Sequence, residues 1–154
     1  MGTFRSMSKV AKSISTIGYE GRSINDLLDA LEQEDIQRLV DVRELPLSRK
    51  KGFSKKQLSE KLQAKGIQYV HLRALGNPKE NRDRYRSGDI EGGARIYRQY
   101  LRNGSHSELI SLAKSLDEAK SCLLCFERDH TTCHRDVIVD DLTAELGELE
   151  VKHL

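Results

Sequence analysis

The hydrophobic positions of the chain follow two different periods, which predict strands and helices in alternation. Short apolar or alternating runs predict strands, whereas apolar residues three and four positions apart predict helices. The predicted strands cover residues 14–19, 38–43, 67–72, 122–126 and 149–154. The predicted helices begin near residues 23, 54, 92, 105 and 133. Strands that alternate with helices favour an α/β fold with a mostly parallel sheet of about five strands, layered as in Rossmann-like or rhodanese-like domains.

Local signals refine several of these elements. Serine followed three residues later by an acid or amide predicts capping boxes at Ser23 and Ser54. Thr132 is the predicted N-cap of the last helix. Helical spacing predicts that Tyr100 faces inward from the helix that begins near residue 92. Residues 73–90 are polar and contain a turn signal, so they are predicted to be irregular.

Length and composition fit one folded domain. The chain has 154 residues, of which 37% are hydrophobic and 32% charged, a balance that excludes a membrane protein. We expect residues 14–154 to form a single α/β domain and residues 1–13 to be disordered or left over from expression. The odd number of cysteines, three, argues against a secreted disulfide framework, so cytosolic thiols and a cytoplasmic location are expected.

Charge is distributed unevenly along the chain. Residues 38–65 contain nine cations and three anions, a net charge of +6. Residues 105–154 contain five cations and eleven anions, a net charge of −6. A basic block suggests a phosphate or polyanion partner, although it could also be a solvated face balanced by the acidic half of the fold.

Candidate chemistry lies where the predicted strands end. Ligands of open α/β sheets bind beyond the carboxyl ends of the strands, and these ends meet at one edge when the strands are parallel. Four separate segments of this chain bring polar or reactive residues to that edge, as a functional site would require. The candidates are Asp41, Arg43, Ser48, Arg49, Cys125, Glu127, Cys133, His134 and Arg135.

The two late cysteines are the candidate nucleophiles. Cys133 falls in the predicted first turn of the last helix, where free N–H groups and the neighbouring His134 would lower the pKa of its thiol. Either Cys125 or Cys133 could therefore attack a substrate, with His134 and Glu127 as acid/base partners. Alternatively, both cysteines pack as small apolar residues, and Glu127 only anchors an arginine.

The arginines suggest an anion site. Arg43, Arg49 and Arg135 map to the same edge, and guanidinium groups bind phosphate or carboxylate with two parallel hydrogen bonds. We expect these arginines and Ser48 to hold an anionic group, and Asp41 to orient an arginine. The alternative for Asp41 and Arg43 is a purely structural ion pair.

No metal or other cofactor is predicted. Cys125, His130, Cys133 and His134 lie within ten residues, but the paired C-x2-C spacing of structural zinc sites is absent. Adjacent cysteine and histidine side chains, such as Cys133 and His134, are not expected to turn toward one ion.

Two joint motifs resemble a known family. The segment from Asp41 to Arg49 reads D-V-R-x-x-P-x-S-R, and the segment from Cys125 to Arg135 reads C-x-E-x5-C-H-R. With Thr16-Ile17-Gly18 and Leu75-Gly76, this pattern resembles the family catalogued as domain of unknown function 488. The resemblance implies the α/β fold and this site, but no reaction. The segment 39–44 is also similar to rhodanese-like sulfurtransferases, in which a later strand ends in a cysteine.

These observations lead to three hypotheses. The first is a small cytoplasmic enzyme, a thiol-dependent transferase or hydrolase, that binds a small anionic ligand such as a phosphate or nucleotide, or a nucleic acid. The second is a non-catalytic nucleic-acid-binding module that uses the basic block 38–65. The third is a structural or regulatory partner domain whose thiols have ordinary reactivity. No membrane association is expected, and the sequence leaves the oligomeric state open.

Overall fold

A five-stranded sheet forms the centre of the structure, a computed structural model that describes residues 12–154. Its strands lie in the order β3-β2-β4-β1-β5, and every neighbouring pair is parallel. All carboxyl ends of the strands therefore meet at one edge, as the sequence predicted. The strands are β1 (Ser13–Gly18), β2 (Arg38–Asp41), β3 (Gln68–His71), β4 (Ser121–Cys125) and β5 (Glu150–His153).

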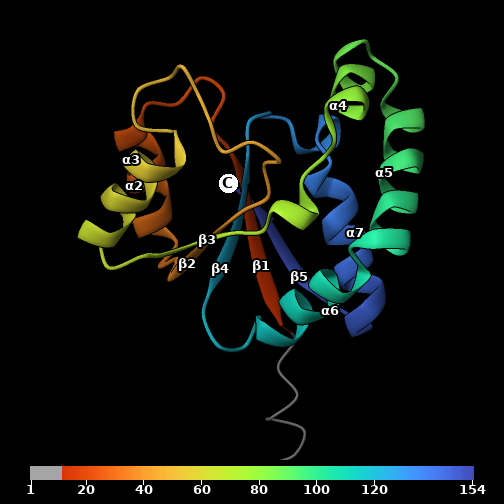
Figure 1. Cartoon of the computed structure of the whole chain (residues 1–154). Helices are drawn as coiled ribbons and strands as arrows, with labels where there is room; N and C mark the ends of the chain where they lie inside the picture. The colour runs from red at the N-terminus through yellow and green to blue at the C-terminus, as the bar shows by residue number, and fades with distance from the viewer. Residues whose placement is uncertain (1–11) are drawn as a thin grey trace, which may run out of the picture.

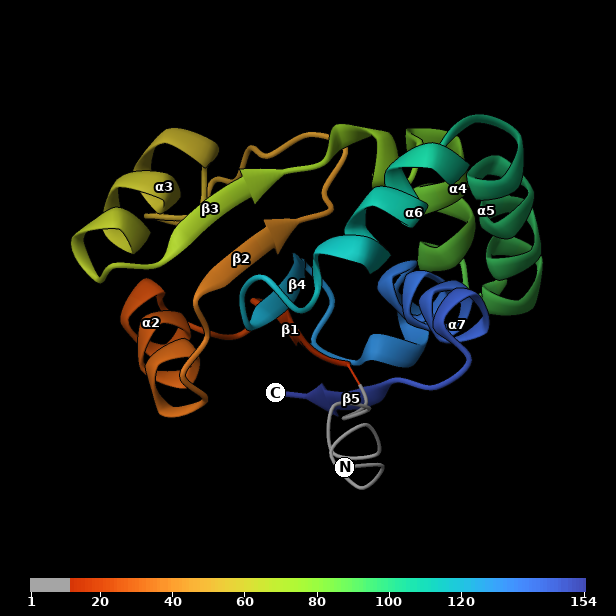
Figure 2. The same cartoon turned by 90° about the horizontal axis from the view of Figure 1, so that it is seen from below.

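Helices cover both faces of the sheet and confirm the α/β prediction. Helices α2 (Ile24–Gln33) and α3 (Lys55–Ala64) lie on one face (Figures 1 and 2). The other face carries α5 (Ile90–Gly104), α6 (His106–Ser115) and α7 (Arg135–Leu146), with α4 (Lys79–Arg86) beside α5 (Figure 2). Two short 3-10 turns, η1 (Arg73–Leu75) and η2 (His130–Thr132), precede α4 and α7.

The core consists of two apolar clusters separated by the sheet. Side chains of successive strand residues point to opposite faces, so Leu123 of β4 joins one cluster and Leu124 the other. The cluster around Leu124 contains the leucine stripes of α2 and α3, and the cluster around Leu123 contains those of α5, α6 and α7. Burial on both faces explains why β4 is apolar at every position except Ser121. The two buried charges of β2, Arg38 and Asp41, are each satisfied by hydrogen bonds inside the fold.

The prediction that residues 73–90 are irregular was wrong, because they contain η1 and α4. Helix α4 lacks an apolar stripe, and its only buried side chains are Asn81 and Tyr85. The Asn81 amide donates to the Asn77 side chain and to the Gly93 carbonyl. Tertiary hydrogen bonds of this kind stabilise a helix that periodicity does not reveal.

The two predicted capping boxes had different outcomes. Ser23 accepts from the N–H of Asp26 and donates through its own N–H to the Asp26 carboxylate, which confirms the first box. Ser54 makes no capping bond, so the second prediction was wrong. Its hydroxyl instead donates to the carbonyl of Ser48 and accepts from the N–H of Ser48, which closes the loop before α3.

The start of the last helix was also predicted wrongly. Thr132 lies in η2, and α7 begins at Arg135 with His134 at its N-cap position. An α-helix capped at Thr132 would need a bond from the N–H of Asp136 to the Thr132 carbonyl, but this N–H donates to the carbonyl of Cys133 instead. On α5, Tyr100 is exposed rather than turned inward.

The two remaining predictions concern the chain start and the membrane. Strand β1 begins at Ser13, next to the expected domain start, and the rest of the expected N-terminal segment lies outside the described residues. In residues 12–154, every helix is too short or too polar to cross a lipid bilayer.

Candidate functional site

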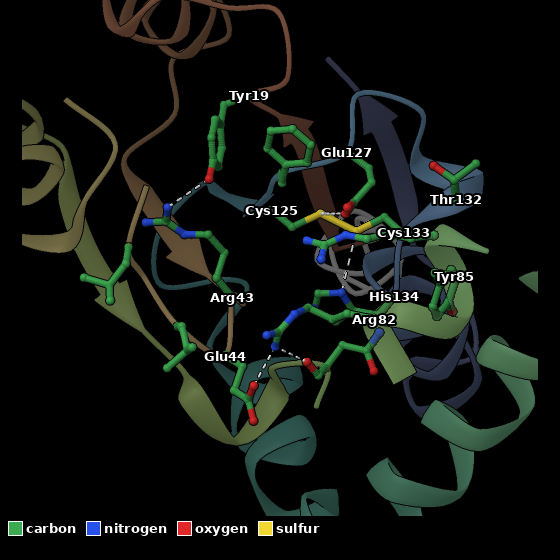
Figure 3. A pocket seen from close by; sticks show the side chains of 15 residues that line it. Tyr19, Arg43, Glu44, Arg82, Tyr85, Cys125, Glu127, Thr132, Cys133 and His134 are labelled. Carbon is green, nitrogen blue, oxygen red and sulfur yellow. Dashed lines mark hydrogen bonds and ion pairs between the residues drawn. A yellow bond between two sulfur atoms is a disulfide. The ribbon is translucent and has the colours of Figure 1, made fainter. Parts of the chain in front are cut away.

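A pocket of about 320 Å³ opens at the carboxyl edge of the sheet. Its walls come from the segments that follow β1, β2 and β4, and from α4 (Figure 3). The lining is part cationic, part acidic and part sulfur-bearing. It includes Tyr19, Arg43, Glu44, Arg82, Tyr85, Arg86, Cys125, Phe126, Glu127, Cys133 and His134.

Asp41 and Arg43 form a buried ion pair at the end of β2. The guanidinium donates from Nε and Nη2 to both carboxylate oxygens at 2.8–3.2 Å, and the Tyr69 hydroxyl donates to the same carboxylate at 2.6 Å. Burial alone would lower the pKa of Arg43, but the hydrogen bonds and charge of Asp41 raise it above its ordinary value. Arg43 therefore stays cationic, and its Nη1 donates to the Tyr19 hydroxyl at the pocket wall at 3.3 Å (Figure 3).

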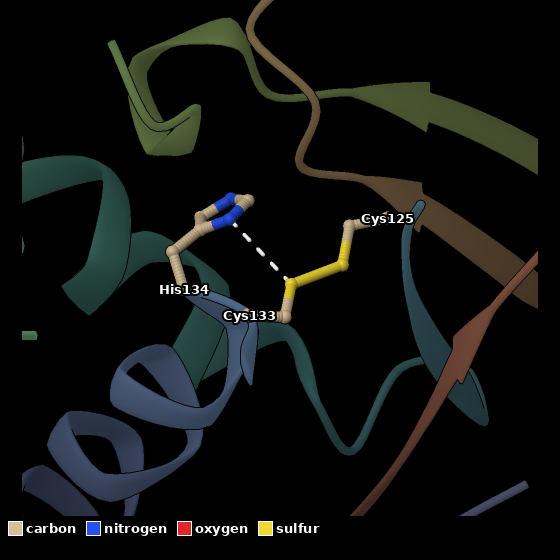
Figure 4. A group of neighbouring side chains, drawn as sticks. All are labelled: Cys125, Cys133 and His134. Atoms are coloured by element: carbon tan, nitrogen blue, oxygen red, sulfur yellow. Dashed lines mark hydrogen bonds between the residues drawn. A yellow bond between two sulfur atoms is a disulfide. The ribbon is translucent and has the colours of Figure 1, made fainter. Parts of the chain in front are cut away.

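The sulfur atoms of Cys125 and Cys133 meet in the pocket wall, where a disulfide joins them (Figure 4). Cys125 ends β4, and Cys133 lies between η2 and α7. The expectation of three free thiols therefore holds only for Cys122, which is buried and whose pKa burial raises. Reduction of this disulfide would yield two thiols in the pocket wall.

His134 presents an unprotonated nitrogen to Cys133. Its Nε2 lies 2.8 Å from the Val42 carbonyl, and a carbonyl only accepts, so Nε2 carries the proton. Nδ1 then has a free lone pair and lies 3.6 Å from the Cys133 sulfur (Figure 4). Burial lowers the pKa of His134 to about 4, which keeps the ring neutral at pH 7. The N–H of Arg135 donates to the same sulfur at 3.4 Å.

Arg135 connects Cys125 to the loop that follows β4. Its Nη1 donates to the Cys125 sulfur at 2.8 Å and to the Glu127 carbonyl at 2.6 Å, and its Nη2 donates to the Arg128 carbonyl. The side chain is only 1% exposed and does not line the pocket. Arg135 thus holds the loop and one sulfur, instead of facing a ligand as the sequence suggested. Glu127 lies 3.9 Å from the Cys125 sulfur, and burial raises the pKa of its carboxyl group.

Gly18 allows this loop to cross the end of β1. A Cβ atom at Gly18 would overlap with the Glu127 carbonyl. The N–H groups of Tyr19 and Glu20 donate to the carbonyls of Cys125 and Phe126, which extends the pairing of β1 and β4 past the strands. The close approach fixes the backbone that carries Cys125 and Glu127.

Comparison with known proteins places the chain in a family. The family model described as Domain of unknown function DUF488 matches residues 23–142, more than half of the chain. The chain belongs to this family. No curated protein and no solved structure matches it. The match contains both motifs that carried the resemblance, and the fold brings Arg43 of the first motif together with Cys133 and His134 of the second in the pocket of this DUF488 domain.

Four sequence candidates do not line the pocket of the DUF488 domain: Asp41 and Arg135, whose contacts are described above, and Ser48 and Arg49. Arg49 is exposed in the loop between β2 and α3, and the hydroxyl of Ser48 accepts from the N–H of Lys50 in the same loop. Arg82 and Arg86 take their place in the pocket wall. Neither arginine was a candidate from the sequence, because α4 lacks the apolar stripe that predicts a helix. Their i, i+4 spacing, which places them on one side of a helix, is the one signal that could have found them.

The basic block 38–65 does not form one surface in the DUF488 domain. Arg38 is buried near the amino end of β2, where it donates to Ser115 and Ser121. Arg43 is paired in the site. The exposed cations that remain together come from the loop and first turn around α3: Arg49, Lys51, Lys55 and Lys56.

Two groups within residues 12–154 could supply metal ligands. The first consists of Cys125, Cys133 and His134, whose ligand atoms lie within 4.8 Å of one another although Cys133 and His134 are adjacent in sequence. His130, Asp136 and His153 form the second group. The rings of His130 and His153 stack with centroids 3.4 Å apart and planes 2° apart. One ion cannot lie in both parallel ring planes, so this group acts as a contact between elements.

Proposed function

We propose that this DUF488 protein is a small cytoplasmic enzyme, a thiol-dependent transferase or hydrolase, that uses Cys133 as its nucleophile on a small anionic substrate. The observation that carries this proposal is the surroundings of the Cys133 sulfur. It lies in a pocket wall, with the free lone pair of His134 Nδ1 at 3.6 Å and the Arg135 N–H at 3.4 Å. A neighbouring base and a donor to the sulfur are what activate a cysteine nucleophile.

The charged side chains of the pocket favour an anionic substrate. Three arginines line it, Arg43, Arg82 and Arg86, against the two acids Glu44 and Glu127. Outside the lining, Arg43 is paired with Asp41, and Arg86 lies 3.8 Å from Asp83 in an exposed ion pair. The Nη1 of Arg82 donates to Glu44 and to the Asn77 carbonyl, and within residues 12–154 its Nε and Nη2 donate to no protein group. Planar guanidinium groups bind phosphate and carboxylate oxygens well.

Tyr85 offers a further donor to the substrate. Its side chain lines the pocket and is buried, and within residues 12–154 its hydroxyl has no hydrogen-bond partner. Burial raises the pKa of Tyr85 to about 12, so the hydroxyl keeps its proton at pH 7. Buried polar groups without a protein partner are rare, and an oxygen of a phosphate or nucleotide would satisfy this one.

The proposed reaction has two steps in the reduced enzyme. The thiol proton of Cys133 passes to His134 Nδ1, while the sulfur forms a bond to the electrophilic atom of the substrate. The bond to the leaving group breaks, and this group departs with the electron pair and receives the proton from His134. Water or an acceptor then attacks the same atom, the bond to sulfur breaks, and the proton of the attacking group restores the thiol.

The test compares two alkylating agents that differ in charge. The reduced protein is treated with iodoacetate or iodoacetamide in the presence of a chelator, and the modified cysteines are located by peptide mass. We expect Cys133 to prefer the anionic reagent by about tenfold relative to a short cysteine peptide, because a cationic cleft concentrates anions. Inorganic phosphate should slow the reaction, and buried Cys122 should remain unmodified.

Matched variants on α4 separate pocket charge from overall charge. The double variant Arg82→Gln and Arg86→Gln should lower the preference toward that of the peptide. Arg84→Gln removes a cation from the same helix outside the pocket and should leave the preference unchanged. A preference that survives the double variant, or a Cys133 inert to both reagents, would overturn the proposal.

A second candidate function is nucleic-acid binding through the loop around α3. Arg49, Lys51, Lys55 and Lys56 are exposed, and in the described part of the chain none of them forms an ion pair. Unpaired cations on one segment can follow a phosphate backbone. This function needs no thiol chemistry, so alkylation and oligonucleotide binding distinguish the two candidates.

A further inference from the structure

The three side chains Cys125, Cys133 and His134 lie together in the pocket wall. We infer that, in the reduced protein, they form a binding site for a divalent metal ion of the Zn²⁺ type. This inference goes beyond the proposed function, which uses the thiol of Cys133 without a metal. The two share side chains but can fail separately.

The spacing of ligand atoms matches zinc coordination. Zn–S bonds of about 2.3 Å and Zn–N bonds of about 2.1 Å at a tetrahedral ion place sulfur and nitrogen about 3.6 Å apart. The Cys133 sulfur and His134 Nδ1 lie 3.6 Å apart. The lone pair of Nδ1 is free because Nε2 donates to the Val42 carbonyl. Histidine ligands of metals are almost always held in this way by a hydrogen bond from the other ring nitrogen.

Both sulfurs also have donors that favour the thiolate, which is the form that binds metal. Arg135 donates to the Cys125 sulfur through Nη1 at 2.8 Å and to the Cys133 sulfur through its N–H at 3.4 Å. Charge-assisted hydrogen bonds of this kind stabilise a negative sulfur in a buried position. The ligands themselves are buried, with Cys125 and Cys133 each 2% exposed and His134 6% exposed.

The backbone spacing of the two cysteines suits an ion between them. Their Cα atoms lie 7.6 Å apart, whereas disulfide-bonded cysteines usually span about 4.4–6.8 Å. Reduction by a dithiol or phosphine adds two electrons and two protons and yields two thiols. A divalent ion then displaces those two protons and binds the thiolates, which stand about 3.8 Å apart at a tetrahedral ion.

The ligand set leaves one coordination position open. Two thiolates and one imidazole are soft and borderline ligands, which select Zn²⁺ over Mg²⁺ or Ca²⁺. Sites with three protein ligands keep the fourth position for water or substrate. All three side chains line the pocket, so this position faces the pocket with its arginines. An ion here would occupy the Cys133 sulfur and block its attack on a substrate.

The experiment uses Co²⁺ as a spectroscopic substitute for Zn²⁺ on the full-length protein, reduced with a phosphine under anaerobic conditions. We expect one equivalent of Co²⁺ to produce a thiolate charge-transfer band in the near ultraviolet, together with the visible bands of a tetrahedral ion. One equivalent of Zn²⁺ should abolish both bands. It should also protect Cys125 and Cys133 from alkylation in the wild-type chain, a readout that requires no variant.

Variants identify the ligands. Loss of the hydrogen-bond partner of a metal ligand typically lowers metal affinity about 10–100-fold. Cys125→Ser, Cys133→Ser and His134→Asn each remove a ligand itself, so each should lower the affinity for Co²⁺ by more than that. Cys122→Ser and His153→Asn, which alter the free cysteine and the other His/Asp group, should retain the bands.

The possible failures are distinct. Absence of a thiolate band in the reduced wild-type chain would overturn the metal site, as would a band that survives Cys133→Ser or is lost in His153→Asn. The iodoacetate preference is measured in chelator, so it is unaffected by these outcomes. If no thiolate band forms with Co²⁺ but Cys133 still prefers iodoacetate, only the metal site is overturned. If the band forms but Cys133 shows no preference for iodoacetate, only the thiol mechanism is overturned.

Discussion

At the scale of single residues, the charge of Asp41 is removed from water and must be compensated by neighbouring side chains. Its carboxylate is fully buried and accepts hydrogen bonds from Arg43 and Tyr69. The Arg43 guanidinium is 7% exposed, so each charge has few other partners. Removing one member of a buried pair leaves the other as an uncompensated charge.

We therefore expect Asp41→Asn to lower the free energy of unfolding by about 3–5 kcal/mol, measured by urea denaturation. The substitution keeps the size of the side chain and removes its charge. The control is Asp83→Asn at the exposed Lys79–Asp83 pair, where little change is expected. Equal effects of the two variants would contradict a demand for charge balance at Asp41.

The residues of the site differed in how well they could be predicted. Asp41 and Arg43 were predictable because the alternation of a strand places them on one side, and the structure pairs them. Ser48 and Arg49 were not, because the path of a loop depends on contacts such as the Ser54–Ser48 hydrogen bonds. The role of Arg135 in holding the loop carbonyls depends on its complete burial, which no local pattern reveals.

At the scale of elements, a pair of stacked histidines connects the end of β5 to η2. His153 contacts the Thr16 hydroxyl of β1 through Nδ1 at 2.6 Å, and its ring lies on that of His130. His130 in turn contacts the Asp136 carboxylate of α7 at 2.7 Å. The stack thus joins the last strand to the loop between the two site cysteines.

This contact should weaken in acid. Burial lowers the pKa of His153, and the charges of His130 and Arg135 lower it further. The charge of Asp136 raises the pKa by a smaller amount than these together lower it. Because the folded pKa lies below the unfolded value of about 6.5, the contribution to stability is present above that pH and is lost as pH falls from there through the folded pKa. The urea midpoint should fall more between pH 7.5 and pH 5 in the wild type than in His153→Gln. Equal falls would contradict this prediction.

Elements that bury an apolar face were predictable, and the polar helix was not. The segment that became β4 is short, buried on both faces and apolar except at Ser121, so its composition indicated a strand. Helix α4 depends on the Asn81 hydrogen bonds and on the packing of Tyr85 against Gly93, both of which come from outside the helix. Arg82 and Arg86, and with them part of the pocket, were missed for this reason.

At the scale of the whole molecule, the exposed cations around α3 form a basic segment of the surface. The exposed cations around α3 have no acidic partner in the described residues, whereas Lys65 is paired with Glu32. Such a surface can bind a polyanion without any pocket chemistry.

If this surface binds single-stranded oligonucleotide, the logarithm of the affinity should fall linearly with that of the salt concentration. The triple variant Lys51→Gln, Lys55→Gln and Lys56→Gln should reduce the magnitude of the slope by about 2, because each contact contributes about 0.7. Lys114→Gln, Lys120→Gln and Lys152→Gln together remove the same charge elsewhere and should leave the slope unchanged. Equal slopes in both triple variants would contradict binding by this loop.

Topology explains why the site could be anticipated while its details could not. A parallel sheet brings all strand ends to one edge, so residues from distant segments meet there whatever the strand order. The order β3-β2-β4-β1-β5 itself was not predicted, because it depends on which faces the helices cover. Contact between the sulfurs of Cys125 and Cys133 follows from the loop that Arg135 holds, a tertiary feature.

The composition of α4 has a consequence for how ligands would be detected. A helix with few buried apolar side chains opens locally at a lower free energy than the central strands, so its amide protons should exchange with deuterium early. Since α4 supplies one wall of the pocket, a ligand that binds there stabilises the folded form of α4. A bound anion would then be visible as slowed deuterium uptake in α4, at amides that the anion never touches.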